Sequence, residues 1–166
     1  MSIEFQVTET LPAPPERVFQ AMTNVDEYGA WMPDFIRAER VGEVAQGAGA
    51  RWRETRKMFG KETTEEFEVT HYHPPSHLSV RVDGSKGTSG KGIFDFDYKL
   101  AQRVGGTEVR LTGRVDGLLP PMLRWMGGLL VVPFKRACAR DLRALAEHLR
   151  HAASAAAGAD MQTSSS

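Results

Sequence analysis

Residues 51–69 read RWRETRKMFGKETTEEFEV, a pattern that predicts a β-hairpin. Two strand-like runs flank Gly60-Lys61, and a two-residue turn with glycine first is typical of a type II′ β-hairpin. Such a turn sets every pairing on either side of it. The predicted cross-strand pairs are Phe59 with Glu62, Met58 with Thr63, Arg56 with Glu65, Glu54 with Phe67 and Trp52 with Val69.

This pairing sorts the side chains into two faces, because successive residues of a strand point to opposite sides. One face is polar and charge-matched, with Thr55 opposite Glu66 and Arg53 opposite Glu68. The apolar face carries Trp52, Met58, Phe67 and Val69. Glu54 and Arg56 share that apolar face, where an unpaired charge is costly. They become the first candidate site residues.

A second hairpin surrounds Gly105-Gly106. Its predicted pairs are Leu100 with Val109, Tyr98 with Leu111, Phe96 with Gly113 and Phe94 with Val115, all on one apolar face. Leu78, Val80 and Val82 continue this face on the preceding strand, and the reverse face is polar. We therefore expect an antiparallel sheet that is dry on one side, with Gly113 leaving room opposite Phe96.

The rest of the chain supplies a strand before these hairpins and a helix after them. Residues 3–8 alternate like a strand, and two short helices over 16–22 and 26–31 precede six strands within 34–117. Apolar residues then recur at helical spacing from Met122 to Leu149, with Gly127-Gly128 and Pro133 predicting two segments or one bent helix. We expect one α+β domain over residues 1–151 and a fraying or disordered tail over 152–166.

Composition excludes several classes of protein. The 166 residues are 41% hydrophobic, and 21 Lys and Arg balance 21 Asp and Glu. These are globular values without the positive field that nucleic-acid binding needs. The N-terminus carries no secretory pattern, and the apolar stretch 127–134 is too short to span a bilayer, so we expect a cytoplasmic protein without stable membrane insertion. The single Cys138 is expected to be a buried, inert thiol.

Several short motifs resemble a known family. They are Ala13-Pro-Pro-Glu-Arg-Val-Phe19, Trp31-Met-Pro33, Gly47-Ala-Gly-Ala-Arg51, Pro74-Pro75, Gly106-Thr-Glu-Val109 and Asp141-Leu-Arg-Ala-Leu145. In order and spacing over residues 3–150 they resemble the polyketide cyclase/dehydrase-like branch of the START and birch-allergen superfamily, also called SRPBCC. The resemblance implies the helix-grip fold: a seven-stranded, curved antiparallel sheet wrapped around a long C-terminal helix, with two short helices between the first two strands. It also implies a cavity that in many relatives holds a lipid, hormone, sterol or polyketide.

Candidate ligand-binding residues are the large side chains on the predicted inner face of the sheet and helix. They are Trp52, Met58, Phe67, Val69, Val80, Phe94, Phe96, Tyr98, Leu111, Met122, Trp125, Met126 and Leu129. In the alternative interpretation, the helix residues fill the space and the interior is an ordinary packed core.

Glu54, Arg56 and Tyr98 are the candidate catalytic residues. Glu54 suits a general base or a hydrogen-bonding anchor, and Arg56 suits a ligand carboxylate or enolate. A structural alternative pairs Arg56 with Glu65 near the hairpin tip. Tyr98 suits a donor to a ligand carbonyl, or a core tyrosine bonded within the protein.

We expect neither a metal nor a cofactor. His71, His73 and His77 flank the Pro74-Pro75 turn, without a cysteine nearby, and are interpreted as part of a surface turn. The glycine-rich residues 84–92 lack the spacing of a phosphate-binding loop and are interpreted as a flexible loop near the cavity mouth.

Three functions stay open. The first is a small-molecule binding protein that holds an apolar or amphipathic ligand, such as a lipid, polyketide or aromatic compound. The second is a polyketide cyclase, aromatase or dehydratase. The third is an interaction module, similar to the family's chaperone co-activators, that uses residues 118–134. Either a monomer or a homodimer is compatible with the sequence.

Overall fold

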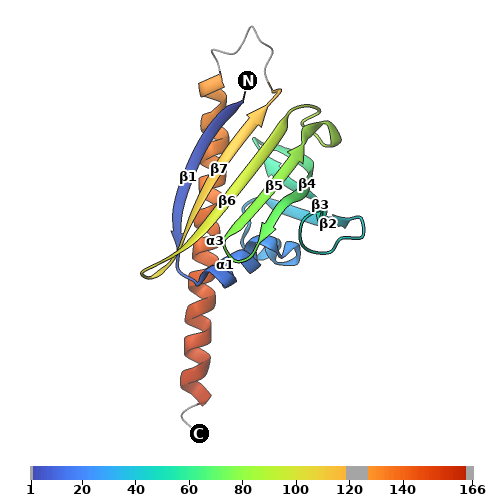
Figure 1. The fold of residues 1–166 in the computed structure, drawn as a ribbon. Helices are drawn as coiled ribbons and strands as arrows, with labels where there is room; N and C mark the ends of the chain where they lie inside the picture. The colour runs from blue at the N-terminus through green and yellow to red at the C-terminus, as the bar shows by residue number, and fades with distance from the viewer. Residues whose placement is uncertain (1, 119–126, 164–166) are drawn as a thin grey trace.

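The computed structural model describes residues 2–118 and 127–163. Figure 1 shows a curved sheet with one long helix, α3 (Gly127–Thr163), running along its concave side. The sheet order is β1-β7-β6-β5-β4-β3-β2, and every neighbouring pair is antiparallel. The seven strands are β1 (Ile3–Leu11), β2 (Phe35–Val41), β3 (Arg51–Met58), β4 (Lys61–His73), β5 (His77–Asp83), β6 (Ile93–Arg103) and β7 (Gly106–Asp116).

Short helices connect β1 to β2, as predicted. They are α1 (Pro15–Thr23), the 3₁₀ turn η1 (Val25–Glu27) and α2 (Tyr28–Trp31), and a second 3₁₀ turn, η2 (Gly84–Lys86), follows β5. Pro15 occupies the first turn of α1, where its missing N–H costs nothing. The helix buries Val18, Phe19 and Met22 at one end of the sheet.

The β6–β7 hairpin has the predicted register, with Tyr98 opposite Leu111 and Phe96 opposite Gly113. The room expected at Gly113 is occupied, however. A Cβ built on Gly113 would lie 2.2 Å from Cζ of Phe5, so the ring from β1 covers this glycine. Because glycine has no side chain, Gly113 allows the Phe5 ring of β1 to pack directly over β7.

The β3–β4 hairpin differs from the prediction in register. Met58 pairs with Lys61 and Trp52 with Phe67, a displacement of two residues along β4. The central turn residues are Phe59 and Gly60, with φ of 51° and 81°, and positive φ at both positions belongs to a type I′ turn, which matches strand twist. An even displacement leaves each side chain on its predicted face, so Glu54 and Arg56 still point inward.

Helix α3 differs from its prediction at its C-terminal end. It continues to Thr163 through the segment predicted to fray, because the alanines after His151 favour helix even though residues 152–161 are exposed. Pro133 lies inside the helix, and of the two predicted alternatives the described residues form one helix from Gly127 rather than two segments. Figure 1 shows α3 extending well past the sheet.

The core lies between the sheet and the middle of α3. Leu142, Leu145 and Leu149 are buried against the sheet, where Leu11, Val109 and Leu111 are also buried. These residues fill one half of the concave side. The other half, beneath residues 134–145 of α3, is hollow. None of the described helices is both long and apolar enough to cross a membrane.

Candidate functional site

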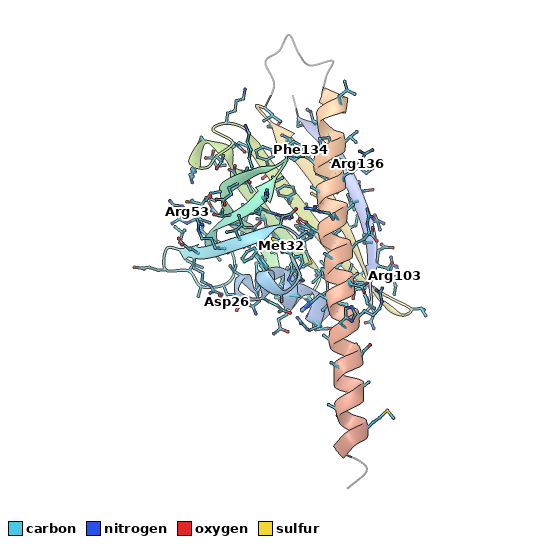
Figure 2. All side chains as sticks on the ribbon, turned by 180° about the vertical axis from the view of Figure 1, so that it is seen from behind. Asp26, Met32, Arg53, Arg103, Phe134 and Arg136 are labelled. Carbon is cyan, nitrogen blue, oxygen red and sulfur yellow. The ribbon has the colours of Figure 1, made fainter. Side chains whose placement is uncertain are left out.

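The hollow half of the sheet forms a cavity of ≈ 280 Å³. Strands β3 to β6 supply one wall, α2 and the residue after it supply an end, and α3 supplies the opposite wall. Most lining side chains are apolar; they include Met22, Trp31, Met32, Trp52, Phe67, Val80, Val82, Phe94, Phe96, Phe134 and Leu142. Figure 2 shows Phe134 on the flank of α3 toward the β3–β4 hairpin and Arg136 on the other flank.

The cavity reaches the surface beside the β3–β4 turn. Phe59 lines it and is 70% exposed, and its ring meets Phe134 edge to face at 6.3 Å. Ser89, in the glycine-rich loop, lines the same region. This loop is held to β4, since Ser89 donates from its N and Oγ to Glu65 Oε1 at 2.8 and 2.7 Å. The position of this loop is therefore consistent with the prediction that it lies near the cavity mouth.

A polar cluster occupies the wall between β3 and α3. Arg56 donates through Nη1 and Nη2 to the two carboxylate oxygens of Asp141, both at 2.8 Å. Its Nη2 also donates to the Pro33 carbonyl at 3.0 Å, and Glu54 Oε1 lies 3.7 Å from Nη1. Arg56 is therefore a partly buried clamp between sheet and helix. The predicted pairing of Arg56 with Glu65 is wrong, because the register shift moves Glu65 opposite Glu54.

Glu54 is the most enclosed member of this cluster, with its side chain 3% exposed. Burial raises its pKa from 4.5 to about 7, against the lowering effects of Arg56 and of the Trp52 indole, which donates to Oε2 at 3.4 Å. Nearby Asp141 raises the pKa further. Because Arg56 is already engaged by Asp141, it compensates Glu54 only in part. A carboxyl group with this pKa can exchange a proton near neutral pH.

Tyr98 and Cys138 complete the polar wall. Burial raises the pKa of Tyr98 well above its ordinary value, and Cys138 and Asp141 add to the effect. Burial likewise raises the pKa of the Cys138 thiol to about 12. Both groups are therefore protonated at neutral pH, which agrees with the expected inert thiol.

The cavity contains most but not all of the predicted site residues. Those that line it are Trp52, Glu54, Arg56, Met58, Phe67, Val80, Phe94, Phe96 and Tyr98. Three predicted ligand-binding residues lie elsewhere. Val69 lines a separate pocket of ≈ 20 Å³, and Leu111 is buried in the packed half of the core. Leu129 is 68% exposed, on the outer side of α3. Met122, Trp125 and Met126 lie outside the described residues.

Sequence reasoning missed the contributions of the helices. Asp141 makes the closest contacts of Arg56. The sequence could have indicated that Asp141 faces inward, because its spacing places it on one helical stripe with Cys138 and Leu145. Trp31 and Met32 had no such signal, since the two short helices have no periodicity long enough to indicate which face turns inward.

The histidines lie around a surface turn, away from the cavity. The rings of His71 and His77 are 4.2 Å apart, and His77 Nε2 lies 2.6 Å from Asp97 Oδ1. Within residues 2–118 and 127–163, no group of three or more His, Cys, Asp or Glu side chains is arranged to hold a metal ion.

Comparison with known proteins assigns the family. Residues 2–150 match the family model described as polyketide cyclase / dehydrase and lipid transport. The chain belongs to this family. The match covers the sheet, the short helices and α3 as far as Arg150, so the SRPBCC resemblance and the helix-grip fold are both confirmed. A comparison with curated protein sequences found no significant match.

Solved structures share the family fold at low sequence identity. TTHA0849 from Thermus thermophilus aligns with a TM-score of 0.72 and 19% identity, covering 90% of this chain and 99% of that one. Ara h 8.0201 aligns with a TM-score of 0.61 and 18% identity, covering 87% and 99%. DynU16, from the dynemicin biosynthetic locus, aligns with a TM-score of 0.63 and 20% identity, covering 89% of this chain and 47% of DynU16. Identities this low establish the fold alone.

Proposed function

We propose that the protein binds a small apolar or amphipathic molecule in the cavity between the sheet and α3. The observation that carries the proposal is the cavity itself: ≈ 280 Å³, walled by aromatic, aliphatic and methionine side chains, with one polar cluster. Ligand pockets commonly measure roughly 300–1,000 Å³ and combine an apolar lining with a few polar groups that orient the ligand. The volume lies just below this range.

The size and lining of the cavity favour a compact aromatic or alicyclic ligand over a long acyl chain. Met22, Met32 and Met58 line the cavity, and flexible thioethers adapt to irregular apolar shapes. Phe67, Phe94 and Phe96 offer aromatic surfaces for stacking. A small-molecule role also fits the family description and the biosynthetic locus of DynU16.

Extraction of a bound molecule tests the proposal. Native mass spectrometry of the purified protein, followed by solvent extraction, is expected to detect a co-purifying small molecule, and the neutral dye N-phenyl-1-naphthylamine is expected to fluoresce on binding. Val82→Phe fills the cavity from the wall of β5 and should abolish both signals. Val104→Phe, at the fully exposed β6–β7 turn, is the matched control. Absence of both signals from the wild type contradicts the proposal.

The polar cluster favours one alternative, an enzyme of the cyclase or dehydratase type. Glu54 has a pKa of about 7 and lines the cavity, so it is suited to remove and return a proton on a bound substrate. Conversion of the extracted molecule by the wild type, with loss of conversion in Glu54→Gln and retained binding, supports catalysis. Binding without conversion in the wild type supports a carrier or sensor.

A further inference from the structure

Among the described residues, the hydroxyl of Tyr98 has no hydrogen-bond partner. Tyr98 lies on β6 between Leu78 of β5 and Leu111 of β7, and its side chain lines the cavity. Within residues 2–118 and 127–163, no hydrogen bond includes the Tyr98 hydroxyl. Its oxygen is also absent from the fully buried, unpaired side-chain atoms of these residues, which are Trp31 Nε1, Arg56 Nε and Glu65 Oε2. The hydroxyl therefore borders the open cavity.

A second tyrosine that lines the same cavity, Tyr28, does have a hydrogen-bond partner within the protein. Tyr28 is buried, lines the cavity from α2, and donates its hydroxyl to the Met22 carbonyl at 2.7 Å. Tyr98 has no equivalent acceptor in the described part of the chain. A phenol placed on an apolar wall without a partner costs stability, which is consistent with a role toward a ligand.

The charges around Tyr98 limit what that ligand can be. Glu54 and Asp141 contribute two carboxyl groups and Arg56 a single cation, whose two Nη atoms Asp141 already occupies. A ligand carboxylate at Tyr98 would add a third acidic group to one guanidinium in a desolvated site, and like charges repel strongly there. A neutral oxygen avoids this cost and still accepts a hydrogen bond. Because the pKa of Tyr98 is raised, its hydroxyl remains a donor.

We propose that the cavity selects neutral aromatic or alicyclic molecules that carry a carbonyl-type oxygen, which accepts a hydrogen bond from the Tyr98 hydroxyl, and that it discriminates against carboxylates. This inference rests on the proposed function, since it names the class of ligand for the same cavity. It also separates two roles: the apolar wall supplies affinity, and Tyr98 supplies the choice among ligands of similar shape.

Three ligands of matched shape test the inference: the hydrocarbon 2-isopropenylnaphthalene, the ketone 2-acetylnaphthalene and the carboxylate 2-naphthoate. Dissociation constants are measured by equilibrium dialysis at about pH 8. The ketone should bind roughly fivefold more tightly than the hydrocarbon, as one net hydrogen bond implies, and the carboxylate more weakly than both. Tyr98→Phe removes only the hydroxyl and should erase the ketone's advantage. Tyr28→Phe, the control, should change affinity for the ketone and the hydrocarbon by the same factor.

Thermal unfolding provides a second readout that is independent of any ligand. Tyr98→Phe should leave the Tm unchanged or raise it, because no hydrogen bond of the described residues is lost. Tyr28→Phe should lower the Tm, because the bond to the Met22 carbonyl is lost.

The possible failures are distinguishable. If none of the three compounds binds, the proposed function fails together with this inference. If the hydrocarbon binds but the ketone has no advantage, or the advantage survives in Tyr98→Phe, the inference alone is overturned. It is also overturned if 2-naphthoate binds most tightly, or if Tyr98→Phe loses as much stability as Tyr28→Phe.

Discussion

Replacement of Glu54 by Gln probes the electrostatics of the cavity wall directly. Glu54 is 3% exposed, and burial raises its pKa from 4.5 to about 7 although Arg56 and Trp52 act in the opposite direction. Glutamine has nearly the same shape and does not titrate. The comparison of the two proteins over a range of pH therefore isolates the proton on Glu54.

The sign of the effect follows from proton binding. Between pH 4.5 and about 7 the folded protein retains a proton on Glu54 that the unfolded chain releases. The contribution of Glu54 to the free energy of unfolding therefore falls as pH rises through this window and levels off above it. One pKa unit corresponds to about 1.4 kcal/mol, so the displacement from 4.5 to about 7 amounts to roughly 3 kcal/mol.

Urea denaturation at a series of pH values between about 4.5 and about 8.5 measures this effect. The stability of Glu54→Gln minus that of the wild type should rise by about 3 kcal/mol across the series, with most of the rise below about pH 7. Glu62→Gln, which removes an exposed carboxylate from the same hairpin, controls for the loss of one negative charge. A difference that is constant with pH, or that falls as pH rises, would mean that the folded protein does not hold a proton on Glu54 near neutral pH.

Three further changes have defined outcomes. Asp141→Asn removes the carboxylate that both Nη atoms of Arg56 engage and should lower the free energy of unfolding by about 3 kcal/mol in urea denaturation; a loss below about 1 kcal/mol contradicts the clamp. Gly113→Ala should lower stability by about 1–3 kcal/mol, since its Cβ would lie 2.2 Å from the Phe5 ring, and an unchanged Tm would mean that the ring yields. Truncation after residue 151 should change stability by less than about 0.5 kcal/mol while reducing the helical circular dichroism, and a large loss would show that the extension of α3 has a packing role.

Local patterns predicted the faces of the sheet correctly even where they predicted the register wrongly. The turn of the β3–β4 hairpin lies at Phe59-Gly60 rather than Gly60-Lys61, and each partner moves by two residues. Strand side chains alternate with a period of two, so an even displacement leaves Glu54 and Arg56 inside. The face on which a side chain lies depends only on whether the displacement is odd or even, so an error of two residues in register does not change it.

Contacts between distant segments were beyond any local pattern. Arg56 meets Asp141, which lies 85 positions further along the chain, because the sheet curves around α3 and brings β3 against one stripe of the helix. The same curvature places Leu111 in the packed core and leaves the neighbouring Tyr98 beside open space. No periodicity in the sequence distinguishes these two residues, which are directly opposite each other in the β6–β7 hairpin.

The element order, the family and the inward faces of the strands could therefore be predicted from the sequence, because these depend on short-range spacing and turn chemistry. Folding of the whole chain determines which inward residues pack together and which surround a cavity. It also brings Arg56 against Asp141 and leaves the Tyr98 hydroxyl facing the cavity without a partner among the described residues. Such choices depend on the separation between a curved sheet and a helix, a distance that arises only when the whole chain has folded.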